Sequence, residues 1–277
     1  MIPKLIFSDI DGTLIKPGGE LTKVNIDTIK KLTQKNIPFI LVSARSQEEM
    51  MDYYSQLELG TPIISYNGGF ISKYQNGSFE SISSIFIEPN ESKIIYDIIT
   101  TQFPTISLSI YSETKWYASK IDRGVQIEKD LTGLSPVILN VKEFIDSSAP
   151  IHKIMMIGEK DVILEAEKVL KENKDLTSSI HKSGTIYLEV TNKKATKINA
   201  VKYVIENFYN IDPKEVMAIG DSYNDLEMLG YVGLGVAMGN APQEIRKSVK
   251  YITDSNTDNG VAKAIEKLVL LTLENCL

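Results

Sequence analysis

Short apolar runs alternate with helical patterns at the start of the chain. Residues 5–7 form an apolar run that leads into acidic residues, and 21–36 place apolar side chains at helical spacing. A second apolar run covers 38–42. A helix-like segment then precedes a third short strand within 62–69, where an Asn and two glycines mark a turn. Strands separated by helices predict a parallel sheet.

The same pattern returns near the end of the chain. Residues 198–208 show a helical apolar face, 216–220 read as a buried strand, and 261–269 predict a terminal helix. Between about 82 and 190 the sequence is instead rich in Ser, Thr and Tyr, with strand-like alternation in 105–118. We therefore predict an α/β domain made from both ends of the chain, with an α+β module inserted into it.

Composition narrows the class of protein. The chain has 277 residues, which favours one large domain or a core with a second module, and its formal charge of −6 argues against nonspecific binding to nucleic acid or anionic lipid. The single Cys276 has no partner for an internal disulfide, and the first apolar run is too short for a secretory signal or a membrane span. The expected location is the cytoplasm, and no protein partner is indicated.

Acidic residues follow two of the predicted strands. Asp9 and Asp11 come directly after the first strand, where open α/β sheets bind ligands, and strand alternation would put both on one side. Asp221 follows the strand at 216–220, with Asp225 close behind. Carboxylate oxygens from two strand ends suit octahedral Mg²⁺. Taken alone, the first cluster is equally well explained as an Asp-Gly turn, and the second also fits a helix N-cap.

Two further positions could hold a phosphate. Ser43, Ala44 and Arg45 follow the strand at 38–42, where a hydroxyl and backbone amides can bind a phosphate oxygen. Lys197 begins the helix that carries Ile198, and it offers a point charge for the same group. A lone Ser is usually a helix cap, and a lone Lys is usually a solvated side chain. Ser43 and Lys197 therefore indicate a phosphate site only because they occur together with the acidic clusters.

The chain contains four segments that resemble, in the same order, the four motifs of the haloacid dehalogenase-like hydrolases. They are DIDGT, SAR, a downstream Lys and GDSYND. The runs at 67–69, 238–241 and 258–261 are most similar to the Cof-type, class IIB phosphatases. Two departures stand out: Ser43-Ala44 where Thr-Gly is usual, and Gly69 where Ala is usual. They affect loop geometry, because Ala44 adopts positive φ less readily than Gly.

The resemblance implies a role for each matching position. Asp9 would be the nucleophile and a Mg²⁺ ligand, and Asp11 the general acid and base, with its backbone carbonyl on the metal. Asp221 would complete the protein ligands of the metal. The other implied roles are phosphate or substrate binding by Ile10, Ser43, Ala44, Lys197 and Asn224, and support by Thr13, Arg45 and Asp225. The expected activity is hydrolysis of small-metabolite phosphate monoesters through an aspartyl-phosphate.

The resemblance also implies a Rossmann-like parallel-sheet core with an inserted α+β cap of the C2 type, subclass B. The spacing agrees, because the stretch from Ser43 to Lys197 is far longer than one crossover needs. The expected division is core 1–82, cap 83–190 and core 191–277. Candidate cap contacts to substrate are Tyr111, Trp116, Tyr117, His181, Lys182 and Ser183, although packing is the commoner role of such residues. His152 and His181 lack metal-ligand spacing.

Other functions stay open from the sequence. A phosphosugar mutase or phosphotransferase would use the same aspartyl-phosphate chemistry, and the core motifs do not separate it from a phosphatase. A non-catalytic phosphometabolite sensor could keep the fold, but it would not need the proton donor Asp11. A receiver-like domain would be much shorter. Among substrates, sugar phosphates, flavin mononucleotide and pyridoxal phosphate all remain candidates.

Overall fold

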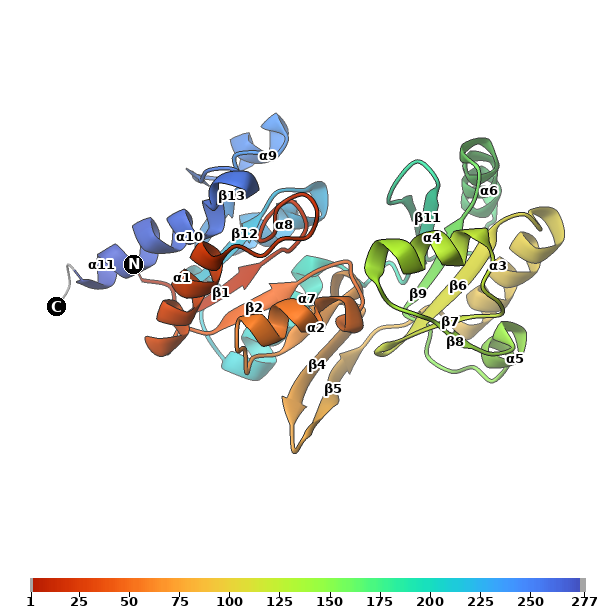
Figure 1. The fold of residues 1–277 in the computed structure, drawn as a ribbon, viewed down its shortest axis with the longest axis horizontal. Coiled ribbons are helices and arrows are strands. Elements are labelled where there is room, and N and C mark those ends of the chain that lie inside the picture. Colours follow the sequence, from red (N-terminus) through yellow and green to blue (C-terminus); the bar gives the residue numbers. More distant parts are fainter. Residues whose placement is uncertain (1, 275–277) are drawn as a thin grey trace. The chain divides into compact units, whose positions relative to one another are not determined.

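The structure is a computed structural model that describes residues 2–274, so Cys276 lies outside the described residues. The chain forms two compact units. The first unit combines the two ends of the chain, as 1–44, 50–82 and 196–277. The second consists of Arg45–Glu49 and Ser83–Ala195. Both units appear in Figure 1.

The first unit is built on an eight-stranded sheet. In spatial order its strands are β14 (Tyr251–Ile252), β13 (Leu234–Ala237), β12 (Val216–Gly220), β1 (Leu5–Ser8), β2 (Phe39–Val42), β3 (Ile63–Ser65), β4 (Phe70–Gln75) and β5 (Ser78–Ser84). The strands from β14 to β3 pair in parallel, and β4 pairs antiparallel with β3. The parallel sheet predicted from both chain ends is therefore present.

Helices cover both faces of this sheet (Figure 1). The longer ones are α1 (Lys23–Gln34), α2 (Gln47–Gln56), α7 (Lys197–Val204), α8 (Leu226–Tyr231), α9 (Gln243–Ser248) and α10 (Gly260–Ile265). Shorter turns are η1 (Tyr66–Gly68), η3 (Pro213–Glu215), η4 (Tyr223–Asp225) and η5 (Asn256–Asp258), and α7 and α10 continue as η2 (Ile205–Tyr209), η6 (Glu266–Leu270) and α11 (Leu271–Glu274).

Alternation along the strands produces two separate apolar layers. Ile6 of β1 packs in a cluster with Ile29 of α1 and Ile265 of α10. Its neighbour Phe7 points to the opposite face and packs with Val201 of α7. Because both faces of the parallel strands are covered, the strands read as continuous apolar runs in the sequence.

The second unit is built on a six-stranded, mainly antiparallel sheet. Its strands in order are β10 (Ser179–Lys182), β11 (Tyr187–Thr191), β9 (Lys153–Ile157), β6 (Ser107–Ser112), β7 (Lys115–Ala118) and β8 (Val137–Ile138), of which β7 and β8 pair in parallel. Its helices are α3 (Pro89–Gln102), α4 (Arg123–Thr132), α5 (Val141–Asp146) and α6 (Lys160–Glu172).

The two faces of this second sheet differ in character. One face packs Ile154 and Leu188 against the apolar sides of α3, α5 and α6. The other face meets α4, where Gly124 lies so close to the sheet that an added Cβ would be 2.5 Å from Ser107. This second face carries the buried polar residues Ser107, Ser109, Lys153 and Glu189.

The α/β class predicted from the sequence is confirmed, with a parallel sheet in the unit that joins both chain ends. Across residues 2–274, no helix has the length and apolar character needed to cross a bilayer.

Candidate active site

The predicted chemical residues gather at one edge of the first sheet. Asp9 follows β1, Ser43 follows β2, and Asp221 follows β12, and these three strands are neighbours that run in parallel. Because parallel strands end at the same edge, residues far apart in sequence are brought together there. Strand β1 ends at Ser8, so the strand alternation expected for Asp9 and Asp11 does not extend to these two residues; Asp9 is buried and Asp11 is exposed.

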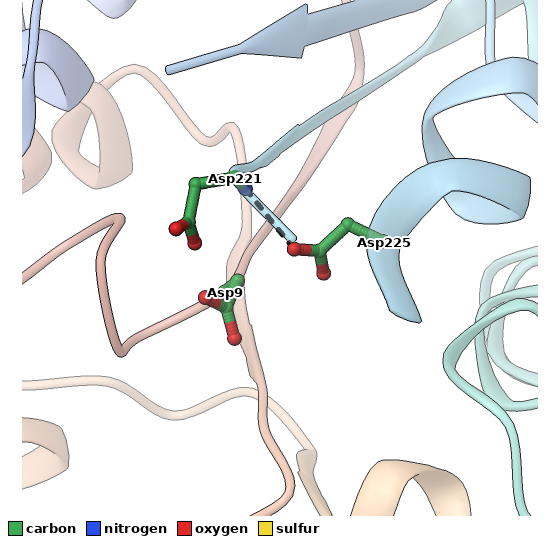
Figure 2. Close-up of side chains that lie close together, drawn as sticks. All are labelled: Asp9, Asp221 and Asp225. Atoms are coloured by element: carbon green, nitrogen blue, oxygen red, sulfur yellow. Dashed lines mark hydrogen bonds between the residues drawn. The ribbon is translucent and has the colours of Figure 1, made fainter. Parts of the chain in front are cut away.

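Three carboxylates converge at this edge (Figure 2). One oxygen each from Asp9, Asp221 and Asp225 lies within 4.8 Å of the others. Asp9 is 4% exposed and Asp225 is fully buried, so neither is a surface acid solvated by water. Buried acids at this spacing require either shared protons or a compensating cation.

Lys197 is the ammonium group inside this cluster. Its Nζ lies 2.6 Å from Asp9 Oδ1 and 2.6 Å from Asp225 Oδ1. Lys197 is the first residue of α7, and Thr196 caps that helix by accepting a hydrogen bond from the Asn199 N–H. The helix start therefore aims a buried lysine, only 2% exposed, at the predicted nucleophile.

Asp225 stabilises the neighbouring loop through hydrogen bonds. Its Oδ2 accepts hydrogen bonds from the backbone N–H groups of Asp221 (3.0 Å) and Ser222 (2.9 Å), while Oδ1 binds Lys197. The bond from the Asp221 N–H is the dashed line in Figure 2. With both oxygens engaged, Asp225 is suited to hold Asp221 and Lys197 in place.

Asp221 is held from the loop after β1. Thr13 Oγ1 donates a hydrogen bond of 2.9 Å to Asp221 Oδ1. Gly12 has φ of +76°, and a Cβ built on it would lie 2.3 Å from Asp221 Oδ2, so this position requires glycine both for its backbone and for space. Asn240 donates from Nδ2 to the Gly12 carbonyl at 2.8 Å. Sequence reasoning gave Gly12 and Asn240 no role, although both lie inside quoted motifs.

The cluster is short of positive charge. Burial raises the pKa of Asp9 to about 8 even though Lys197 opposes the rise, and Asp225 and Asp221 add to it. Burial also raises the pKa of Asp221, against the hydrogen bond from Thr13. For Lys197, burial lowers the pKa, but the carboxylates of Asp9 and Asp225 outweigh it and hold the pKa above its usual value. Three carboxylates around one ammonium form an oxygen-rich donor set that a divalent cation such as Mg²⁺ fits.

Comparison with known proteins decides the family. A family model described as haloacid dehalogenase-like hydrolase matches residues 6–265. The chain belongs to the haloacid dehalogenase-like hydrolases. It is 35% identical to a Haemophilus influenzae protein named "Putative phosphatase", over 96% of this chain and 98% of the relative.

Other relatives are also similar to this chain over nearly its whole length. A Bacillus subtilis 5-amino-6-(5-phospho-D-ribitylamino)uracil phosphatase is 27% identical, over 96% of each chain. A solved haloacid dehalogenase-like hydrolase from Bacteroides thetaiotaomicron is 29% identical with a TM-score of 0.84, covering 96% of this chain and 99% of that one. The predicted family and the predicted enzyme class, a phosphoric monoester hydrolase, are confirmed.

The other predicted site residues of this hydrolase differ in their burial and in their hydrogen-bond partners. Ile10 is buried, and its carbonyl accepts hydrogen bonds from the turn that follows. Ser43 is 1% exposed, with its N–H donating to the Ile64 carbonyl. Asn224 is exposed and donates from Nδ2 to Asn67 Oδ1. Ala44 is the last residue of the first segment of the first unit, and Arg45 begins the short segment that groups with the second unit.

The candidate contacts in the second unit of the hydrolase have mixed positions. Tyr111 and Trp116 are buried and stacked on each other, and Tyr117 packs on Phe144, which is structural packing. Three others lie at the β10 end of the sheet. His181 Nε2 is 3.8 Å from Glu189, Ser183 donates to Glu189 at 2.7 Å, and Lys182 is 3.8 Å from Glu167.

Sequence reasoning missed a second buried charge cluster in this unit. Lys153 is 5% exposed and lies 3.9 Å from Glu189, with its Nζ 4.5 Å from the ring centre of Tyr111. Glu128 of α4 is also buried, and it accepts a hydrogen bond of 3.4 Å from the Tyr111 hydroxyl. The available signal was the lysine at the start of the apolar strand β9.

Proposed function

We propose that the protein is a Mg²⁺-dependent phosphatase that hydrolyses small-metabolite phosphate monoesters through an aspartyl-phosphate on Asp9. The observation that carries this proposal is the close grouping of buried Asp9 and Lys197 with half-buried Asp221, where the two aspartates follow adjacent strands and the lysine begins α7. A carboxylate held beside an ammonium group and a second carboxylate suits attack on a phosphoryl group, whose charge must be neutralised before an anion can approach.

Mg²⁺ would be held by the side chains of Asp9 and Asp221 and by the backbone carbonyl of Asp11. When bound, the cation supplies charge neutralisation and orientation of the phosphoryl oxygens. Asp225 would support this site through its hydrogen bonds to the loop of Asp221. Second-sphere partners of this kind keep metal ligands oriented.

In the first step, a carboxylate oxygen of Asp9 attacks phosphorus as the bond from phosphorus to the leaving alkoxide breaks. Asp11 gives its proton to that alkoxide, which suits its exposed position next to the buried nucleophile. In the second step, Asp11 takes a proton from water as the water attacks phosphorus, which releases inorganic phosphate and restores the Asp9 carboxylate. Splitting the displacement into two steps lowers each barrier.

The transferring phosphoryl group would be bound by Lys197, the Ser43 hydroxyl and backbone amides of Ile10, Asp11 and Ala44. Asn224 would orient the substrate phosphate from the η4 turn. The hydrogen bond from Thr13 to Asp221 would stabilise the loop that leads into this turn. Arg45, which directly follows Ala44, would support the phosphate-binding loop.

For the substrate we propose a phosphorylated sugar, sugar alcohol or cofactor. The support is the Bacillus subtilis relative, whose name gives a phosphorylated ribityl compound as its substrate. The second unit, predicted as 83–190, would act as a C2-type cap that excludes water and selects the leaving group. The proposed location is the cytoplasm.

The test is release of inorganic phosphate from a panel of phosphorylated sugars, nucleotides and cofactors, with and without Mg²⁺. Wild type is compared with Asp9→Asn and Asp11→Asn. We expect Mg²⁺-dependent release that both substitutions remove. An isomeric sugar phosphate formed without phosphate release would instead favour a mutase, and absence of phosphate release from every substrate would favour the mutase or the sensor.

A further inference from the structure

Three successive residues after β3 adopt left-handed backbone conformations. Their φ values are 52° for Tyr66, 55° for Asn67 and 103° for Gly68. Two of the three are not glycine, and Tyr66 is fully buried. Residues held in this sparsely populated region need surrounding contacts to keep them there, and such residues cluster at functional sites. We call Tyr66–Gly68 the 66–68 turn.

Asn67 connects this turn to two loops of the proposed site. Its backbone N–H donates a hydrogen bond of 2.8 Å to the carbonyl of Ser43. Its side-chain Oδ1 accepts a hydrogen bond of 3.0 Å from Nδ2 of Asn224. One residue thus holds the loop after β2 with its backbone and the turn after β12 with its side chain. Those two strands are not adjacent, because β1 lies between them.

Gly68 connects the same turn to the helix that carries the buried lysine. A Cβ built on Gly68 would lie 2.7 Å from Ala200 Cβ and 2.8 Å from the Thr196 carbonyl, both in the first turn of α7 or its cap. The next residue after Thr196 is Lys197. The absence of a side chain at position 68 therefore lets the 66–68 turn lie directly against the start of α7.

These contacts reach the supports of three groups proposed to bind phosphate: the loop of Ser43, the side chain of Asn224 and the helix start that carries Lys197. We propose that Asn67 is a positioning residue of the active site, which orients the Asn224 amide toward the substrate phosphate. This inference rests on the proposed function. Asn67 takes no part in bond making, so its removal is expected to weaken phosphate binding and leave the nucleophile intact.

The central test is a double-substitution cycle with Asn67→Gly and Asn224→Ala. Glycine tolerates the left-handed backbone, so Asn67→Gly removes the side-chain amide and keeps the turn. The readouts are KM, kcat and inhibition by orthovanadate in the presence of Mg²⁺, together with the melting temperature. We expect Asn67→Gly to raise KM and to weaken orthovanadate inhibition, each about 10-fold. In an Asn224→Ala background the further effect should fall below about 2-fold.

Asn36→Gly is the matched control, because Asn36 is also left-handed, with φ of 59°, and lies in the same unit. It should change neither KM nor orthovanadate inhibition. Equal losses from Asn67→Gly in both backgrounds, or unchanged inhibition in the single variant, would overturn the inference. If wild type releases no phosphate, the proposed function fails instead, and the cycle is then measured as the orthovanadate-induced melting shift. In that case coupling of the two substitutions in the shift supports the inference, and equal losses of shift overturn it.

Discussion

Each unit of this hydrolase buries one lysine among carboxylates, but the two clusters are built differently. In the first unit, Lys197 projects from a helix start and lies 2.6 Å from two aspartates that follow parallel strands. In the second, Lys153 projects from the face of an antiparallel sheet and lies 3.9 Å from Glu189. The first cluster lies at strand ends, where loops meet. The second lies on the sheet face that meets α4, and the charges of Glu49 and Arg45 also act on Lys153.

Location and net charge distinguish a buried cluster with a chemical role from one with a structural role. Strand-end acids sit in loops whose backbones can also bind ligands, and the first cluster carries more negative charge than Lys197 neutralises. In the second unit, burial lowers the pKa of Lys153, but Glu189, Glu49 and Glu128 outweigh it and raise the pKa overall. Tyr111 covers the Lys153 ammonium, and Ser183 satisfies Glu189. We interpret the second cluster as structural.

Exchanging each lysine for methionine should give the largest contrast. Lys197→Met removes the only buried ammonium described near Asp9, and we expect turnover to fall about 10³-fold because phosphoryl charge is no longer neutralised. Lys153→Met should leave turnover of a small substrate such as p-nitrophenyl phosphate within about 3-fold, while unfolding free energy falls by about 3 kcal/mol. Steady-state kinetics and urea unfolding check both. Equal loss of turnover in the two variants would break the distinction.

Acid should weaken the second unit through His152. This buried ring accepts the Glu113 N–H at Nδ1 and contacts Ser84 Oγ at Nε2, and burial lowers its pKa to about 4. Between pH 6.5 and 4 the unfolded chain therefore binds more protons than the folded protein. Stability is complete above about pH 6.5 and falls as the pH drops, by about 3 kcal/mol at pH 4.

The measurement is urea unfolding from pH 4 to 7.5 for wild type and His152→Asn. Asparagine offers a neutral acceptor near the position of Nδ1, so the variant should lose this part of the pH dependence. His181→Asn is the control, because His181 belongs to the same unit and is the other histidine of the chain. A pH slope that persists in His152→Asn but disappears in His181→Asn would contradict the assignment.

A side chain added at position 12 should disturb the cluster around Lys197 and leave the cluster around Lys153 unchanged. In Gly12→Ala the new Cβ meets Asp221 Oδ2, so the carboxylate must move. We expect the Mg²⁺ concentration for half-maximal activity to rise about 10- to 100-fold, as when the support of a metal ligand is lost. Gly18→Ala is the control, because Gly18 also has positive φ but open space around it. A rise of the same size in both variants would point to backbone strain as the cause.

The two helix caps should give the smallest effects. Thr196 caps α7 and Asp122 caps α4, each by accepting a hydrogen bond from the N–H three residues on. Replacing either with alanine should cost about 1 kcal/mol of unfolding free energy. Only Thr196→Ala should also reduce kcat, because Lys197 is the next residue. Thermal melts and initial rates distinguish the two, and reduced kcat in Asp122→Ala would count against the structural interpretation of the second cluster.

Much of the first unit could be predicted because parallel strands buried on both faces leave apolar runs in the sequence. The runs at 5–7, 38–42 and 216–220 all became strands of one sheet. The hairpin of β4 and β5 was not predicted, since its exposed positions carry mixed polar residues. The grouping of Arg45–Glu49 with the second unit could not be predicted either, because it arises from tertiary contacts across distant parts of the chain.

The site was predictable where each residue belongs to a local motif at a strand or helix end. Asp9, Asp221, Asp225 and Lys197 do meet. The link from Asn67 to Asn224 spans 157 positions, and the one from Lys153 to Glu189 joins two strands across a sheet. Such contacts depend on register and packing, which a single sequence does not reveal.

The most direct test of the central claim is chemical trapping of the phosphorylated carboxylate. Wild type and Asp11→Asn are mixed with substrate and Mg²⁺, quenched in acid and treated with borohydride, which reduces an acyl phosphate to an alcohol. Peptide mass spectrometry then locates the change. With p-nitrophenyl phosphate as substrate, whose leaving group needs no proton from Asp11, our account predicts homoserine at position 9 in both proteins, with more of it in Asp11→Asn, whose second step lacks its base. Phosphate release by wild type with reduction at another carboxylate, or at none, would contradict it.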